Sequence, residues 1–273
     1  MLIDAHLHVW RAAPDYPNPS GTTVSPLSDV PVEVLRQYMA EYDVDRAVIV
    51  QPLYPGEDNS YVADCAAAEP ERLAAVCVVD PRDAEAPDRL EYWVTERGCK
   101  GLRLRPSVAE EAACFGDPST FPLWERADRL SVVISVLAGP EHLEAIGAVA
   151  RRFPEVAIMI DHMAHPVVAE GAGSASFQSL LNLASQPRVL VKVSGHSYYS
   201  NEAYPFADCD DLFRALYDRF GPKRLIWGSD FPHVLLKIGY RRAMLLPRRA
   251  YPYLASEELD SIMGENAAQL YWA

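Results

Sequence analysis

Short apolar runs, rich in β-branched residues, alternate along this chain with longer amphipathic segments. The runs are nearly continuous, which is typical of parallel strands that are buried on both faces. Eight of them predict strands over residues 2–8, 46–51, 73–79, 101–105, 131–137, 156–162, 189–194 and 225–230. Strands that alternate with helices in this way favour an α/β fold with one parallel sheet.

Helical periodicity fills most of the segments between these strands. It predicts helices over residues 32–42, 60–69, 84–97, 120–130, 141–152, 176–185 and 210–220, and a closing helix that Ser256 can cap. Asp58, Asn59 or Ser60 can cap the second helix. Segments 11–31 and 231–254 are expected as long loops, and loops of that length are often functional.

Eight strand-helix units in succession predict a (β/α)8 TIM barrel, formed as a single domain by residues 1–273. The alternative is an open, doubly wound sheet. That fold usually carries a Gly-x-Gly-x-x-Gly turn after its first strand, and no such turn follows here. The length also suits a closed barrel better, and 49% hydrophobic residues are enough for one large core.

Charge and composition exclude several classes of partner. A formal net charge of −13 argues against binding to nucleic acid or to an anionic membrane, because both require a basic surface. No apolar run is long enough for a membrane span, and no secretory signal is recognisable. The five cysteines are scattered without Cys-x-x-Cys spacing, so neither a disulfide framework nor a zinc knuckle is expected. A cytoplasmic enzyme or binding protein fits these features.

Barrel enzymes place their active sites at the carboxyl ends of the strands, so polar residues there are the candidates for chemistry. They are His6, His8, Gln51, Asp80, Arg103, Arg105, His162, Ser194, His196 and Asp230. His6 and His8 should share one face of their strand, since side chains two residues apart point the same way. Two such imidazoles can converge on a metal ion or a substrate oxygen, although a pair of ordinary hydrogen-bonded histidines would show the same spacing.

Four of these strand ends carry motifs that resemble the amidohydrolase superfamily. The motifs are Asp4-Ala5-His6-Leu7-His8-Val9-Trp10, Asp161-His162-Met163, Val191-Lys192-Val193-Ser194-Gly195 and Ile226-Trp227-Gly228-Ser229-Asp230-Phe231-Pro232. Within the superfamily, the chain is similar to the amidohydrolase-related branch, which holds dicarboxylate and sugar lactonases together with decarboxylases. The resemblance implies that His6, His8, His162 and Asp230 occupy active-site positions.

The same resemblance leaves the question of a metal open. Metal-dependent members carry a histidine at the end of the fifth strand, and binuclear members a lysine at the end of the fourth. Here the fifth strand ends Ser135-Val136-Leu137 and the fourth ends in Arg105. His6, His8 and Asp230 could still hold one divalent ion, zinc or manganese. The lactonase group can also work without a metal, so a metal-free site is the equal alternative.

The preferred hypothesis is a hydrolase of a small anionic substrate, most simply a carboxylated lactone. Asp230 would activate water, while His6, His8 and His162 would polarise the ester carbonyl. The residues expected to bind the substrate are Arg103, Arg105, Gln51, His196 and Tyr198. Either arginine could instead form a salt bridge at the rim of the barrel.

Two other functions remain as alternatives. One is a metal-dependent, non-oxidative decarboxylase of the same superfamily, which the missing histidine on the fifth strand argues against. The other is a barrel that has lost catalysis and acts as a binding protein. Association into a homo-oligomer through the outer helices is expected only by analogy with other barrels.

Overall fold

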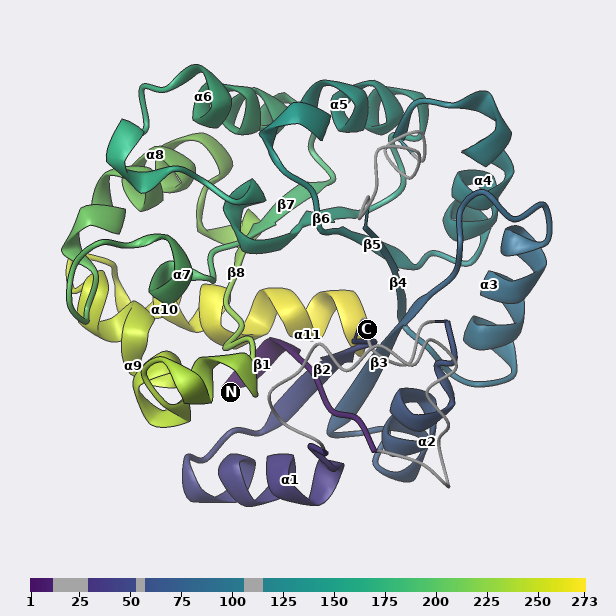
Figure 1. The fold of residues 1–273 in the computed structure, drawn as a ribbon, viewed down its shortest axis with the longest axis horizontal. Coiled ribbons are helices and arrows are strands. Elements are labelled where there is room, and N and C mark those ends of the chain that lie inside the picture. The colour runs from purple at the N-terminus through teal and green to yellow at the C-terminus, as the bar shows by residue number, and fades with distance from the viewer. Residues whose placement is uncertain (12–28, 53–56, 106–114) are drawn as a thin grey trace.

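Eight parallel strands in sequential order form the centre of the protein in a computed structural model that describes residues 1–11, 29–52, 57–105 and 115–273 (Figure 1). The strands are β1 (Ile3–Leu7), β2 (Arg46–Val50), β3 (Leu73–Val78), β4 (Gly101–Leu104), β5 (Val133–Val136), β6 (Ile158–Ile160), β7 (Val189–Lys192) and β8 (Leu225–Ile226). Backbone hydrogen bonds from Ala5 to Trp227 and from His8 to Phe231 join the two ends of the sheet. The predicted (β/α)8 barrel is confirmed.

Helices surround the strands on the outside of the barrel (Figure 1). The α-helices of the described residues are α1 (Val32–Glu41), α2 (Ser60–Ala68), α3 (Ala86–Thr95), α4 (Phe121–Arg129), α5 (Leu143–Arg152), α6 (Ala175–Asn182), α7 (His196–Tyr199), α8 (Asp210–Phe220), α9 (Tyr240–Ala250), α10 (Ser256–Asp260) and α11 (Asn266–Tyr271). In the described part of the chain, no helix combines the length and apolar character needed to cross a membrane.

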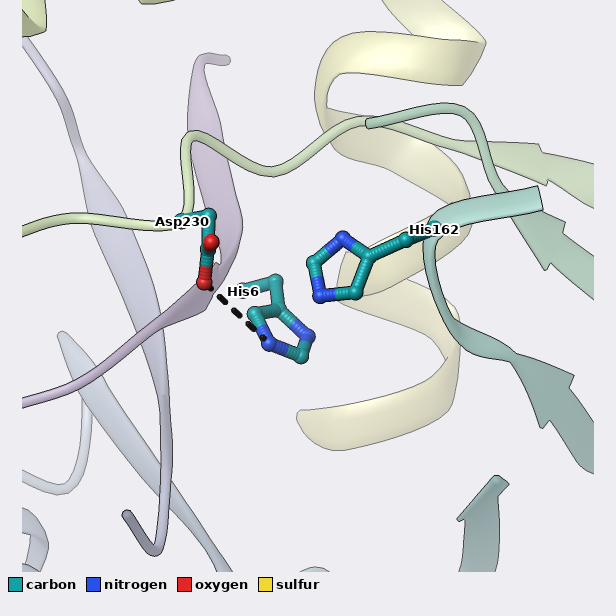
Figure 2. A group of neighbouring side chains, drawn as sticks. All are labelled: His6, His162 and Asp230. Carbon is teal, nitrogen blue, oxygen red and sulfur yellow. Dashed lines mark ion pairs between the residues drawn. The ribbon is translucent and has the colours of Figure 1, made fainter. Parts of the chain in front are cut away.

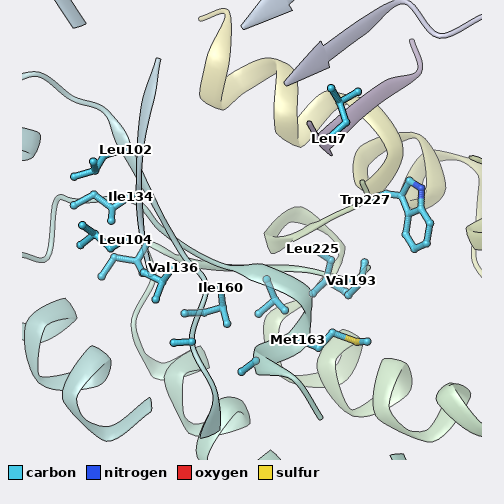
Figure 3. Packing of buried hydrophobic residues seen from close by; sticks show 14 of the residues in the cluster. Leu7, Leu102, Leu104, Ile134, Val136, Ile160, Met163, Val193, Leu225 and Trp227 are labelled. Carbon is cyan, nitrogen blue, oxygen red and sulfur yellow. The ribbon is translucent and has the colours of Figure 1, made fainter. Parts of the chain in front are cut away.

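Side chains of each strand alternate between two apolar layers, as the period of a strand requires. The outer layer packs against the helices and includes Leu102, Leu104, Ile134, Val136 and Ile160 (Figure 3). The inner layer fills the barrel and includes Ile3, Val48, Val50, Val76 and Met159. Removal of this surface from water is the main force that closes the barrel.

The last helix, α11, closes the amino-terminal end of the barrel. Its residues Ala267 and Tyr271 belong to the inner apolar layer. Asn266 donates hydrogen bonds to the carbonyl groups of Pro222 and Leu225, at the start of β8. The barrel rule therefore leads us to expect the substrate cavity at the opposite end, where the strands have their carboxyl ends.

Several predicted boundaries were wrong. Helix α9 lies inside segment 231–254, which was expected to be a loop; Pro247 and a run of arginines had obscured its periodicity. Ser256 is the first helical residue rather than the cap, and the backbone N–H of Ala255 donates to the carboxylate of Glu258. Strands β6 and β8 are shorter than predicted: β6 ends at Ile160, before the turn Asp161–Ala164, and irregular backbone follows β8 from residue 227.

Some sequence-based expectations concern residues that are not described. Most of segment 11–31, proposed as a functional loop, lies outside the described ranges, as do residues 106–114 and hence Cys114. The four cysteines within those ranges, Cys65, Cys77, Cys99 and Cys209, are all free and buried.

Candidate active site

A cavity of about 460 Å³ opens at the carboxyl ends of the strands. Its wall consists of His8, Pro52, Arg103, Leu137, His162, His165, Tyr198, Tyr199, Asp230, His233, Leu236 and Lys237. These residues come from segments that follow seven of the eight strands, or from the strands themselves. The imidazoles, the carboxylate and the cations therefore face one space that can hold a small molecule.

An irregularity in β1 sets the directions of His6, which is completely buried, and of His8, which lines this cavity. Ile3 and Asp4 pair with consecutive residues of β2, but Leu7 pairs with Ile49, so β1 contains one residue more than its partner. Such a bulge restarts the alternation of side chains and re-aims those that follow. The two imidazole rings lie 5.1 Å apart, and His8 Nδ1 contacts the carbonyl oxygen of Val50 at 2.8 Å.

The segment after β8 holds Asp230 against β1. Asp4 accepts hydrogen bonds from the backbone N–H of Ser229 (2.8 Å) and from its hydroxyl (2.5 Å), and burial raises the pKa of Asp4 to about 6. Gly228 passes so close to His6 that a Cβ atom there would lie 2.5 Å from the Cβ of His6. Asp230 itself has a left-handed backbone, with φ of 61°. Only glycine at position 228 permits this close approach, which explains the residue's place in the motif.

The carboxylate of Asp230 contacts both a phenol and two imidazoles. Tyr198 donates a hydrogen bond to Oδ2 at 2.9 Å, while Oδ1 lies 3.3 Å from His8 Nε2 and 3.8 Å from His6 Nε2. Burial alone would raise the pKa of Asp230, but hydrogen bonding from His8 and the other nearby imidazoles outweigh it, and the pKa lies below its ordinary value. Asp230 is therefore ionised at neutral pH.

His162 lies in a tight turn, Asp161–Ala164, that directly follows β6. Its φ of 51° is left-handed, and its ring points toward His6, with the two ring centroids 4.6 Å apart (Figure 2). Ser194, after β7, contacts His162 Nδ1 through its hydroxyl at 2.8 Å. Burial lowers the pKa of His162 to about 4, so the ring is neutral at physiological pH.

Beneath the cavity, Lys192 and Asp161, which were not predicted as site residues, form a buried charged group with Arg103, which was predicted to bind the substrate. Lys192 Nζ lies 3.0 Å from Asp161 Oδ1, and Arg103 Nε lies 3.3 Å from Asp161 Oδ2. Lys192 Nζ also lies 2.9 Å from His6 Nδ1. Lys192 and Asp161 are completely buried. A lysine inside a buried apolar strand such as Val189–Lys192 requires a counter-charge, and this signal could have placed it in the site.

The predicted substrate-binding residues are only partly brought together. Arg103 and Tyr198 line the cavity, with Arg103 also paired to Asp161. Gln51 is buried and donates to the carbonyl oxygen of Asp58 at 2.8 Å, and His196 is buried against the hydroxyl of Tyr251. Arg105 follows β4 and is half-buried. Of the described residues, those three do not belong to the cavity wall.

Four other residues of the wall were missed or only weakly favoured from the sequence. Tyr199 contacts His165 Nδ1 through its hydroxyl at 2.6 Å, and both line the cavity. His233 packs its ring against His8, with centroids 5.6 Å apart. Lys237 places its ammonium group 5.8 Å from the ring of Tyr198, at the exposed mouth. All four lie in segments whose course depends on the tertiary structure, so strand periodicity could not position them.

The side chains of His6, His162 and Asp230 have the chemistry of a divalent-metal site (Figure 2). Their ligand atoms all lie within 4.8 Å of one another. Zinc bonds of about 2.1 Å keep two donors no more than about 4.2 Å apart, so the side chains would have to move closer together. The position of Lys192 is also unusual, because a metal-bound histidine normally directs its second nitrogen at a carboxylate or carbonyl group. The residue types fit an ion, but the hydrogen bonding around His6 does not.

Comparison with known proteins agrees with this description. A family model described as amidohydrolase matches residues 3–272. The chain is 33% identical to an L-fucono-1,5-lactonase of Burkholderia ambifaria over 234 residues, which cover 84% of this chain and 80% of the relative. It is 27% identical to a 4-sulfomuconolactone hydrolase of Rhizobium radiobacter, covering 84% of this chain and 75% of that one.

A similar fold is found among solved structures. An amidohydrolase from Burkholderia multivorans, crystallised with bound zinc, superimposes with a TM-score of 0.82 over 99% of both chains, at 24% sequence identity. At this identity the likeness supports the fold alone.

Proposed function

The chain belongs to the amidohydrolase family, and from that premise we propose that it hydrolyses a small lactone by acid-base chemistry at Asp230. It is a hydrolase, since the family and the named relatives are hydrolytic. The lactonase relatives favour ester hydrolysis over decarboxylation, and they remove the reason to consider a barrel without catalysis.

The assignment of Asp230 as the general base rests on one observation. The two oxygens of Asp230 have different surroundings: Oδ2 accepts from Tyr198, while Oδ1 faces His8 and His6. An ionised carboxylate whose orientation is fixed in this way can accept a proton from a water molecule in the cavity. The water oxygen would bond to the lactone carbonyl carbon, and the ring C–O bond would break. The proton held by Asp230 would then pass to the departing ring oxygen.

Neutral imidazoles beside the base can polarise the carbonyl group. His162 stays neutral at physiological pH, and burial together with the nearby Lys192 keeps the pKa of His6 well below its ordinary value. A neutral imidazole donates one hydrogen bond, and such a donor stabilises the negative charge that develops on the carbonyl oxygen. We assign this role to His6 and His162, whereas His8 directs Nδ1 at the carbonyl oxygen of Val50 and Nε2 at Asp230 Oδ1.

The substrate class follows from the charges of the wall. Arg103 and Lys237 contribute two cations to a protein that is otherwise strongly acidic. Arg103 is buried with its Nε beside Asp161, while Lys237 is exposed at the mouth. A small lactone that carries an anionic group is the ligand that these two cations would favour.

A substrate panel tests the proposal. The purified protein would be given L-fucono-1,5-lactone, a neutral sugar lactone, and 4-sulfomuconolactone, an anionic one, with proton release followed by a pH indicator. A carboxylated aromatic acid would be included, with carbon dioxide measured as the product. Hydrolysis above the spontaneous rate, absent in Asp230→Asn, would support the proposal. Release of carbon dioxide without hydrolysis of either lactone would contradict the proposal and would indicate a decarboxylase instead.

A further inference from the structure

Lys192 is the last residue of β7, and its side chain enters the interior of the barrel. Val189 and Val191 pack in the outer apolar layer, whereas Leu190 belongs to the inner one. By alternation, Lys192 shares the inner face with Leu190. Its ammonium group is completely buried and lies on the far side of the His6 ring from Asp230.

Three acceptors surround the ammonium group of Lys192. Asp161 Oδ1 lies 3.0 Å from Nζ, His6 Nδ1 lies 2.9 Å away and Ser135 Oγ lies 3.4 Å away. An ammonium group has three N–H donors and no lone pair, so each neighbour must accept. His6 Nδ1 is therefore an acceptor, and the single ring proton of the neutral imidazole lies on Nε2.

This hydrogen bond decides what His6 presents to the active site. A ring nitrogen that carries a proton is a hydrogen-bond donor and has no lone pair for a metal ion. His6 Nε2 is buried, and within the described residues it has no hydrogen-bond partner, with Asp230 Oδ1 as far as 3.8 Å away. A donor left unsatisfied at this position is suited to bond an oxygen atom of a bound substrate.

We propose that Lys192 is a positioning residue that holds His6 as an Nε2–H donor and thereby keeps divalent metal ions off the His6, His162 and Asp230 group. The functional role of the Lys192–His6 hydrogen bond rests on the proposed hydrolysis, in which the Nε2–H group of His6 polarises the lactone carbonyl. The hydrogen bonds themselves do not depend on the substrate.

The surroundings of Lys192 show what its removal would do. Asp161 Oδ1 lies 3.6 Å from His6 Nδ1, and Lys192 stands between them as the nearer partner of both. Without the ammonium group, Asp161 would become the acceptor for an Nδ1–H group, which is the usual arrangement behind a metal-bound histidine. Arg103 would remain as the counter-charge of Asp161, so a Lys192→Met variant keeps that buried carboxylate paired.

The first test measures the affinity of the metal-free protein, residues 1–273, for Zn²⁺ and Mn²⁺ by calorimetry. Lys192→Met should bind zinc roughly 10–100-fold more tightly than the wild type. Lys237→Met is the matched control, since it makes the same substitution at a lysine of the cavity wall that does not contact His6, and its zinc affinity should change less than about threefold. Equal affinity in Lys192→Met and wild type would overturn the proposal, as would equal tightening in both variants.

A second measurement does not use the Lys192→Met variant, so it holds even if that variant fails to fold. In wild-type protein with ¹⁵N-labelled histidine, the resonance lost in His6→Gln identifies His6, and its nitrogen shifts report which nitrogen carries the proton. A proton on Nε2 is expected, and a proton on Nδ1 would overturn the proposal. Because neither measurement uses turnover, failure of the lactone panel alone would refute the proposed function and leave this inference standing.

Discussion

The hydroxyl of Tyr198 donates a hydrogen bond to Oδ2 of Asp230 over 2.9 Å. Tyr198 belongs to the short helix α7 after β7, whereas Asp230 follows β8, so the contact joins two adjacent strand ends. It leaves Oδ1 as the oxygen that faces His8 and His6. The carboxylate is thus oriented before a substrate arrives, which lowers the cost of reaching the reactive geometry.

Replacement of Asp230 by asparagine should lower kcat about 10²–10⁴-fold on any lactone that the protein hydrolyses. The amide has nearly the same shape but cannot accept the proton of water, so KM should change only a few-fold. Steady-state kinetics on the two lactones would measure both parameters. An unchanged kcat would remove Asp230 from the role of base.

Tyr198→Phe tests the orientation of that carboxylate separately from its chemistry. Loss of the hydroxyl should reduce kcat by about tenfold, roughly the free energy of one hydrogen bond to a charged group. Tyr199→Phe is the control, because the Tyr199 hydroxyl contacts His165 rather than Asp230. If both variants lose the same activity, the effect belongs to the cavity wall in general and not to Asp230.

The buried charges beneath the site should matter for stability. Asp161→Asn would leave Lys192 and Arg103 without their shared counter-charge, and breaking a buried pair in this way costs about 3–5 kcal/mol in the free energy of unfolding. Asp260→Asn provides the comparison, since Asp260 forms an exposed pair with Arg248 and should cost less than about 1 kcal/mol. Urea denaturation at neutral pH would measure both, and equal losses would contradict the expectation.

Lys237 should contribute to recognition of anionic substrates but not neutral ones. Because it is exposed, Lys237→Met should raise KM for 4-sulfomuconolactone only about two- to fivefold at low salt, and the effect should shrink as salt is added. KM for L-fucono-1,5-lactone should stay the same. A parallel rise for both lactones would show that the side chain shapes the mouth rather than attracting charge.

The sequence predicted the barrel, and it offered candidate site residues at the strand ends, because both depend on local periodicity. Eight apolar runs separated by helical segments require little tertiary information, and the barrel rule then brings distant strand ends such as His6, His162 and Asp230 together. The hydrogen bond from Tyr198 to the Asp230 carboxylate was not predicted, although Tyr198 was selected as a binding residue. That contact depends on the path of the chain after β7, which periodicity does not determine.

Lys192 shows what could have been found from the sequence. Its position on the inner face of β7 follows from the alternation of strand side chains, and a buried lysine requires an acidic partner. The partner, Asp161, was already part of a recognised motif. The contact with His6 could not be foreseen, because it depends on the bulge that re-aims the side chains of β1.

His196 offers a test of the fold's response to acid. Burial lowers its pKa to about 4, and it lies against Tyr251 rather than in the described cavity wall. Its ordinary pKa is 6.5, so the unfolded chain binds the proton more readily than the folded one between pH 6.5 and 4. The contribution of a neutral His196 to the free energy of unfolding is fully present above pH 6.5 and is lost as the pH falls toward 4.

The His196→Gln variant should therefore lose less stability in acid than the wild type does. Between pH 7 and pH 4.5 its free energy of unfolding should fall by about 2–3 kcal/mol less, since each unit of pKa shift corresponds to about 1.4 kcal/mol. His162, whose pKa is also lowered to about 4, and Asp4, whose pKa is raised to about 6, titrate in both proteins, so their opposing contributions cancel in the comparison. Urea denaturation at several pH values would measure the difference. Parallel curves for the two proteins would mean that His196 is protonated as readily in the folded chain as in the unfolded one.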